Sequence, residues 1–152
     1  MEQTQEIVEQ IFTKYLKEHS LRKTPERFAI LDRIYSIKGH FDIDDLHAFM
    51  RENNYHVSRA TLYNTIDLLV DCNLVIKHQF GKNNISTFEK AHDKGIHHHF
   101  ICMACGNVKE FSDANIKHAV QSKKINNFNI SHYTLYIYGT CGKCKKGKTV
   151  KK

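Results

Sequence analysis

The sequence of 152 residues has 41% hydrophobic side chains and a formal net charge of +7, which suits one domain or two small ones and excludes a disordered chain. No apolar run approaches the roughly 20 residues that a membrane-spanning helix needs, so we expect a cytoplasmic protein without a membrane segment. Residues 1–90 hold 12 Lys and Arg against 13 Asp and Glu, whereas residues 91–152 hold 11 against 3. The basic excess therefore lies towards the C-terminal tail, where such a run is usually a solvated end.

The first half of the chain is predicted to form helices followed by a β-hairpin. Apolar side chains at helical spacing indicate a helix within residues 1–20, and Thr24 with Pro25 supplies an N-cap and a first-turn proline for the next helix. Asp42 and Ser58 are the predicted N-caps of helices over 43–53 and 59–73. Strands over 74–80 and 85–89 then flank the turn-like GKNN. This is the order of a winged helix.

The helix predicted over 59–73 has two different faces. The stripe predicted to be buried comprises Leu62, Ile66, Leu69 and Val70. The opposite face presents Arg59, Tyr63 and Asn64, which suit the base edges and phosphates of a major groove. An ordinary solvated face is the alternative. DNA binding is favoured over a solvated face by basic residues that precede and follow this helix in the sequence, namely Arg22, Lys23, Arg27, Lys77, His78 and Lys82.

From about residue 96 the pattern changes to that of a small α+β module. Strands are predicted over 97–103 and 108–111, then a helix capped by Ser112, then a β-rich run over 132–139. The segment EKAHDKG at 89–95 is polar and ends in glycine, which makes it the predicted linker. The chain is thus divided into a domain at 1–88, a linker at 89–95 and a domain at 96–152.

Four of the five cysteines form two CxxC pairs, Cys102 with Cys105 and Cys141 with Cys144. Two such pairs predict a tetrahedral set of four thiolates around a structural zinc ion. A thioredoxin-like redox pair is the alternative, but the βαβ pattern of that motif does not surround either pair. Cys72 matches no ligand pattern and is interpreted as a small buried hydrophobe.

The histidines near residue 98 predict a second and different metal site. On a strand, His97 and His99 project to one side, whereas His98 and Cys102 project to the other. Carboxylates lie nearby in the sequence at Glu89 and Glu110. A set of nitrogen and oxygen donors without sulfur suits Fe(II), Mn(II), Co(II) or Zn(II). Exposed histidines on an edge strand remain the alternative.

Taken together, these motifs resemble the ferric uptake regulator family of bacterial metal-dependent repressors. The similarity runs over nearly the whole chain: TPER at 24–27, HFDIDDL at 40–46, VSRATLYNTIDLLVDCNLV at 57–75, FE at 88–89, HHHFICMACGNVKEF at 97–111 and LYIYGTCGKC at 135–144. It implies an N-terminal winged helix-turn-helix domain that binds DNA and a C-terminal dimerisation domain. It also implies a metal-loaded homodimer that represses genes at a palindromic operator.

The resemblance also assigns residues. It places the structural zinc on the four paired cysteines and a regulatory ion, Fe²⁺ or else Mn²⁺ or Zn²⁺, on His40, Glu89, His97, His99 and Glu110. His40 is implied by the resemblance alone. A third site of some members would use positions that hold Ile96, Lys117 and Tyr133, which are poor ligands, although His98, His118 and His132 are near. The predicted DNA contacts are Arg22, Arg27, Ser58, Arg59, Thr61, Tyr63, Asn64 and Lys77.

The predicted function is that of a metal-responsive repressor with no catalytic residues and no small-molecule substrate other than metal ions. Alternatives within the family are a zinc-uptake regulator and a peroxide sensor, in which bound iron oxidises a ligand histidine. In the resembling peroxide sensors an aspartate commonly stands where Glu110 does, but Asn64 is similar to theirs. A metalloenzyme or a zinc-buffering protein is the alternative from another class. The sequence does not decide between a dimer and a tetramer, and it does not identify the operator or the target genes.

Overall fold

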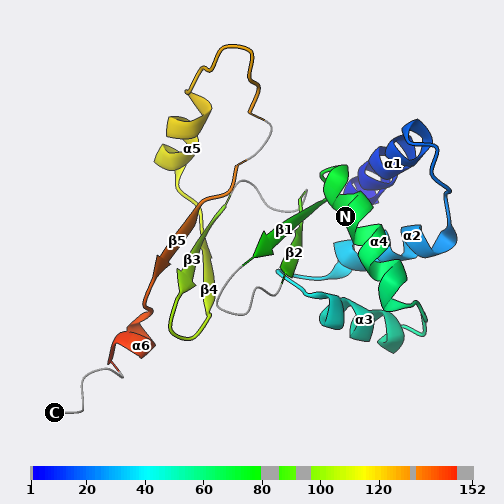
Figure 1. Cartoon of the computed structure of the whole chain (residues 1–152), viewed down its shortest axis with the longest axis horizontal. Coiled ribbons are helices and arrows are strands. Elements are labelled where there is room, and N and C mark those ends of the chain that lie inside the picture. The colour runs from blue at the N-terminus through cyan, green and yellow to red at the C-terminus, as the bar shows by residue number, and fades with distance from the viewer. Residues whose placement is uncertain (1, 80–85, 92–96, 131–132, 147–152) are drawn as a thin grey trace. The chain divides into compact units, whose positions relative to one another are not determined.

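A computed structural model describes residues 2–79, 86–91, 97–130 and 133–146. They form two compact units, which we call the first unit (α1 to β2) and the second unit (β3 to α6), and Figure 1 labels their elements. Within the described residues, none of the helices combines the length and the apolar character needed to cross a membrane.

In the first unit, the second, third and fourth helices begin directly after the residues that the sequence predicts as caps. They are α1 (Glu2–Glu18), α2 (Pro25–Ser36), α3 (Ile43–Glu52) and α4 (Arg59–Asp71). Asp42 and Asp45 form a reciprocal capping box at the start of α3, and the Ser58 hydroxyl accepts the Thr61 N–H at the start of α4. The predicted caps Asp42 and Ser58 are confirmed, whereas Thr24 stands at the start of α2 but its side chain makes no capping hydrogen bond. After α4, Asn73 takes a left-handed φ of 57°, which ends the helix two residues earlier than predicted.

A short antiparallel sheet follows the helices. Strand β1 (Val75–Gln79) pairs with β2 (Ser86–Lys90), so the first two residues of the predicted linker, Glu89 and Lys90, belong to β2. The GKNN turn lies outside the described residues. Phe41 pairs with Phe88 through two backbone hydrogen bonds of 2.9 and 2.8 Å, which attaches the segment before α3 to β2.

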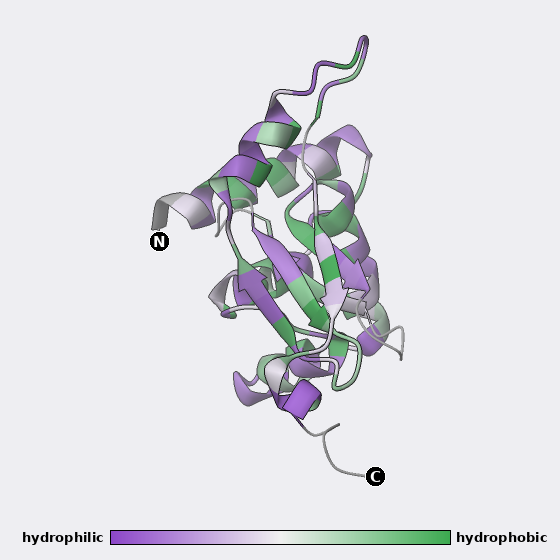
Figure 2. Cartoon of the chain, turned by 90° about the vertical axis from the view of Figure 1, so that its left-hand side faces the viewer, coloured by the Kyte–Doolittle hydropathy of each residue, from purple (hydrophilic) through white to green (hydrophobic). Residues whose placement is uncertain are grey.

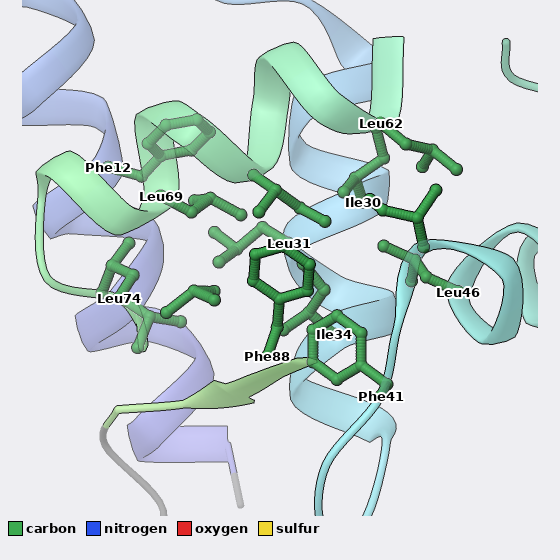
Figure 3. Packing of buried hydrophobic residues seen from close by; sticks show 14 of the residues in the cluster. Phe12, Ile30, Leu31, Ile34, Phe41, Leu46, Leu62, Leu69, Leu74 and Phe88 are labelled. Carbon is green, nitrogen blue, oxygen red and sulfur yellow. The ribbon is translucent and has the colours of Figure 1, made fainter. Parts of the chain in front are cut away.

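The hydrophobic core of the first unit lies between its helices and this sheet. Figure 3 shows Phe41 and Phe88 packed beside Leu31 and Ile34 of α2. In α4, three residues of the predicted stripe are buried, but Val70 is only partly buried and Thr65 is buried instead. The buried members of the core are Val8, Phe12, Leu16, Ile30, Leu31, Ile34, Phe41, Ile43, Leu46, Met50, Leu62, Ile66, Leu69, Leu74, Val75 and Phe88.

In its described residues, the second unit is a three-stranded sheet with two short helices. Strand β3 (His98–Cys102) lies between β4 (Val108–Phe111), which is antiparallel to it, and β5 (Tyr136–Gly139), which is parallel. Helix α5 (Ala114–Gln121) follows β4, and α6 (Gly142–Lys146) follows β5. The predicted cap of α5 was wrong: Asp113, not Ser112, caps it, because its carboxylate accepts the N–H groups of Asn115 and Ile116 at 2.8 and 3.0 Å.

Apolar side chains of the second unit are mostly at its surface. Among the described residues of this unit, Ile101 and Cys102 are the buried hydrophobic ones. Figure 2, in which the sheet of this unit faces the viewer, shows green hydrophobic stretches along its strands. The large exposed apolar side chains here are Phe100, Met103, Ile125, Phe128, Ile130, Ile137 and Tyr138. The second unit therefore buries little apolar surface of its own.

Candidate metal centres

The four paired cysteines gather at one end of the sheet in the second unit. One Sγ atom from each of Cys102, Cys105, Cys141 and Cys144 lies within 4.8 Å of the others. The Cys105 and Cys141 sulfurs are 3.8 Å apart, and the Cys141 N–H donates to the Cys102 sulfur at 3.3 Å. Four sulfurs at this spacing fit the donor set of a tetrahedral zinc ion.

Backbone pairing explains why two distant CxxC pairs meet. Cys102 ends β3, and the chain turns back to β4 through Gly106, whose φ of 75° favours glycine. Because β5 runs parallel to β3 with Gly139 beside Cys102, the residues after β5 arrive at the same end of the sheet. The Lys145 N–H donates to the Cys141 carbonyl at 2.9 Å, and this turn of α6 brings Cys144 back towards Cys141.

The thiols of this cluster are electrostatically unequal. Hydrogen bonds from the backbone N–H groups of Cys141 and Cys105 lower the pKa of the Cys102 thiol to about 6. Hydrogen bonding with the side chains of Cys105 and Cys141 raises the pKa of Cys144 to about 12. Four adjacent thiolates repel one another, so a divalent cation is the partner that would allow all of them to ionise.

The first unit places His40, His78 and Glu89 on one face of its small sheet. The Phe41–Phe88 pairing sets His40 opposite Glu89, and their Nε2 and Oε2 atoms are 3.5 Å apart. His78 Nε2 lies 2.7 Å from Glu89 Oε1, and both side chains are buried. His78, counted in the sequence among the basic residues that favour DNA, is thus buried against Glu89 and is not part of the exposed surface. Strand register makes Glu89 the diagonal neighbour of His78 on the same face of the sheet, and no local sequence motif reveals that register.

The second unit supplies the other predicted donors. Glu110 of β4 lies directly opposite His99 of β3, and the His97 and His99 rings are 5.0 Å apart between centroids. His99 is buried and its ring also lies 5.8 Å from that of Tyr136 on β5. The strand alternation predicted from the sequence thus brings His97, His99 and Glu110 together.

Neither Cys72 nor the region of the third site forms a metal-binding group among the described residues. Burial raises the pKa of the Cys72 thiol to about 11, and the residue packs beside the core of the first unit. His98 is fully buried between the Phe111 and Tyr133 rings, at 5.2 and 5.6 Å. Among the described residues, the groups of three or more potential metal ligands include neither Lys117 nor His118. Ile96 and His132 lie outside the described residues.

The predicted DNA-contacting side chains fall into two groups. Tyr63 is 50% exposed, and Asn64 and Lys77 are exposed as well. Four others already have side-chain partners within the first unit: Ser58 caps α4 and bonds Thr61 Oγ1 at 2.9 Å, Arg59 pairs with Asp44, and the Arg27 side chain donates to the Arg22 backbone carbonyl. The Arg22 side chain is exposed. The Arg59–Asp44 pair is solvent-exposed, which makes it weak enough to exchange for another partner.

A winged helix joined to an α+β unit with a four-cysteine cluster is the architecture of a class of metal-responsive regulators. Comparison with known proteins identifies the family. Residues 18–138 match the ferric uptake regulator family. The chain is 32% identical over 138 residues to the ferric uptake regulation protein of Neisseria meningitidis, covering 88% of this chain and 93% of that protein. It is 31% identical over 132 residues to the peroxide operon regulator of Bacillus subtilis, covering 86% and 89%.

A solved structure points to the same family. The ferric uptake regulator of Pseudomonas aeruginosa, determined with manganese, superimposes with a TM-score of 0.72 at 27% identity and covers 86% of this chain and 97% of its own. The chain therefore belongs to the ferric uptake regulator family. It is a metal-responsive transcriptional repressor, and the predicted winged-helix and α+β fold is confirmed.

Proposed function

We propose that this protein represses transcription in the cytoplasm in response to Fe²⁺, as a homodimer that binds a palindromic operator when its regulatory site is loaded. DNA binding belongs to residues 1–88 and dimerisation to residues 96–152, with residues 89–95 as the link. The observation that carries the proposal is the division of the sulfur-free donors. His40 and Glu89 lie in the first unit, whereas His97, His99 and Glu110 lie in the second.

In this proposal the two donor sets have separate tasks. Cys102, Cys105, Cys141 and Cys144 hold a structural Zn²⁺ within the second unit, where they are close enough to close a tetrahedral shell. The three imidazoles and two carboxylates of the other set form the regulatory site. They offer five or more donors, which exceeds the four that zinc generally takes and favours an iron-type ion, with Mn²⁺ or Zn²⁺ as further candidates.

The regulatory donors couple metal binding to DNA binding because they come from both units. A bound cation would attract the carboxylates and imidazoles that the two units contribute to the regulatory site and hold them in one coordination shell. His40 and Glu89 then fix the orientation of the first unit, and with it the exposed face of α4. A dimer with two such fixed helices matches a palindrome, since protein and DNA then share a two-fold axis.

Homodimerisation is supported by the surface of the second unit. Phe100 and Ile137 are exposed side by side on neighbouring strands of its sheet, Tyr138 is exposed on the opposite face, and Ile125, Phe128 and Ile130 are exposed after α5. Exposed apolar groups of this kind mark contact surfaces in soluble proteins. A second copy of the chain is the proposed partner for this surface.

The proposed DNA interface is the exposed face of α4 with basic residues before and after it. Arg59 and Asn64 suit base edges, Tyr63 suits a phosphate or a thymine methyl, and Lys77 suits the phosphate backbone. Arg59 must first leave Asp44. The full proposed set is Arg22, Arg27, Ser58, Arg59, Thr61, Tyr63, Asn64 and Lys77.

The test is metal-dependent DNA binding by the zinc-loaded protein. A duplex selected by the protein from random DNA in the presence of Mn²⁺ serves as the operator, and gel retardation is measured with anaerobic Fe²⁺ or with Mn²⁺. Retardation is expected only with micromolar added metal, and His97→Ala is expected to abolish the response while keeping the structural zinc. His118→Ala, which changes an exposed histidine of the same unit, is the control. Retardation without metal, or an unchanged His97→Ala protein, would refute the proposal. If no duplex is selected or retarded even with added metal, a metalloenzyme or a zinc-buffering protein would regain support.

A peroxide sensor is the second candidate, favoured by the 31% identity to the peroxide operon regulator and by Asn64 on α4. Glu110 favours plain iron sensing, since peroxide sensors commonly have aspartate at that position. Mass spectrometry of peptides covering His40 and 97–99 separates the two after brief peroxide exposure of the iron form. We expect unmodified histidines; a gain of one oxygen at low peroxide would make peroxide sensing the primary function.

A further inference from the structure

His78 is a buried histidine in the first unit to which the proposed function gives no task. It lies on β1 with 1% of its surface exposed. Its Nε2 atom is 2.7 Å from Glu89 Oε1, and its ring centroid is 5.4 Å from that of His40 at an interplanar angle of 68°. One buried ring therefore contacts both of the donors that the first unit contributes to the regulatory site.

The strand register accounts for this contact. His78 pairs with Thr87 on β2, which makes Glu89, two residues further along, its diagonal neighbour on the same face. The Phe41–Phe88 pairing places His40 on the other side of Glu89 on that face. The opposite face carries Val75, Phe88 and Phe41 into the hydrophobic core. Packing of that face holds the backbone under all three polar side chains.

The hydrogen bond makes the two oxygens of Glu89 different. An ionised carboxylate only accepts hydrogen bonds, so the His78 Nε2–H donates to Oε1. Oε2 is the oxygen on the His40 side, 3.5 Å from His40 Nε2. Rotation of the carboxylate about its last bond would break the 2.7 Å hydrogen bond inside a buried site, which is costly. His78 thereby keeps Oε2 turned towards His40.

We propose that His78 is a positioning residue of the regulatory site, which restricts Glu89 to ligation through Oε2 alone. The inference rests on the proposed role of Glu89 as a regulatory ligand. Outer partners that hold a ligating side chain by a hydrogen bond set its orientation and basicity. Without His78, Glu89 is able to turn and offer both oxygens, which changes the number of donors as well as the affinity.

The experiment uses the full-length, zinc-loaded protein titrated with Co²⁺ and, separately, with Mn²⁺. His78→Leu removes the donor, whereas His78→Gln keeps an N–H donor of similar reach. His118→Gln, at an exposed position, is the matched control. We expect His78→Leu to weaken Mn²⁺ binding about 10- to 100-fold and to alter the visible Co²⁺ d–d bands, because the coordination number changes. His78→Gln should restore most of the affinity and the wild-type bands.

Several outcomes would overturn the inference. Wild-type Mn²⁺ affinity and Co²⁺ bands in His78→Leu would show that the pair only stabilises the fold. Equal loss in His78→Leu and His78→Gln would identify His78 as a ligand instead. If His78→Leu does not fold, His78→Asn takes its place, since its shorter side chain does not reach Glu89. A wild-type protein that takes up no ion beyond its zinc would refute the proposed function, and this inference with it.

Discussion

Each of the two units of this protein is stabilised by different interactions. The first buries an extended cluster of apolar side chains between its helices and its hairpin, whereas the second, in its described residues, buries only Ile101 and Cys102 among its hydrophobic residues and leaves the rest half-buried or exposed. Burying a single large apolar side chain contributes about 1.5–3 kcal/mol, so the first unit has ample driving force from packing alone. The second unit needs other sources.

The arrangement of metal donors differs in a parallel way. The thiolate set lies wholly within the second unit, close enough to close a shell by itself. The imidazole and carboxylate donors are divided between the units, so neither unit holds the complete proposed set. A closed set suits permanent structure, whereas a divided set suits regulation, because filling it changes the freedom of one unit relative to the other.

The largest expected effect is the loss of zinc on changing Cys102 to serine. Zinc binding contributes about 10–16 kcal/mol in small zinc-dependent folds, and removing one thiolate breaks the shell. We expect Cys102→Ser to lose the ion and the dimer, as measured by elemental analysis and sedimentation. Cys72→Ser in the first unit is the control and should keep both. A dimeric, fully folded Cys102→Ser protein would contradict the structural role of the cluster.

A core substitution in the first unit should destabilise that unit but leave the bound zinc in place. Phe12 is fully buried and its ring lies 5.5 Å from that of Phe28. Phe12→Ala is expected to lower the free energy of unfolding of this unit by about 3–5 kcal/mol in urea titration while the bound zinc stays. Ile7→Ala on the same helix, where the side chain is 53% exposed, should change it by less than about 0.5 kcal/mol. Zinc loss in Phe12→Ala would show that the units do not fold independently.

The features predicted correctly from the sequence are those encoded by neighbouring residues. The caps at Asp42 and Ser58 are local patterns, and so are the strands around 98–102 and 108–111. The α5 cap was missed because Ser112 and Asp113 are adjacent and both are good capping residues, so geometry alone decides between them. Likewise, Val70 and Thr65 both lie near the edge of the α4 stripe, and packing decides which is buried.

The features missed at the site depend on pairing between distant segments. The four cysteines carry their own spacing, but His78 shows no ligand-like spacing to Glu89 or His40 in the sequence. Its place follows from the register of β1 with β2 and from the Phe41–Phe88 pairing. His40 likewise came only from the family resemblance. The ligand and DNA-contact roles assigned to these residues stay predictions.

Basic residues in the two units should differ in how they affect DNA binding. Arg59→Ala in the first unit should weaken binding to the selected operator by about 1–3 kcal/mol, the value of a base-reading contact. Removing residues 147–152, which contain three lysines, should mainly reduce the salt dependence of non-specific binding. Fluorescence anisotropy at several salt concentrations measures both. If the truncation abolished selectivity and Arg59→Ala did nothing, the assignment of α4 as the recognition helix would fail.

The last prediction concerns the pH dependence of zinc binding in the second unit. The pKa of Cys144 is raised to about 12 by its neighbouring thiols, so zinc must displace a proton there throughout the physiological range. The zinc-bound state carries fewer protons, hence affinity rises with pH and falls as pH falls. Each displaced proton makes the affinity change about tenfold per pH unit, equivalent to about 1.4 kcal/mol.

Cys102, whose pKa is lowered to about 6, is already a thiolate above that pH and should add a further proton to the slope only below it. Competition with a chelator of known proton affinity between pH 5.5 and 8 measures the slope. In Cys144→His a neutral imidazole replaces the thiol, so the slope above pH 7 should fall by about one proton. A zinc affinity that does not change with pH, or an identical slope in Cys144→His, would show that Cys144 is not among the groups that zinc deprotonates.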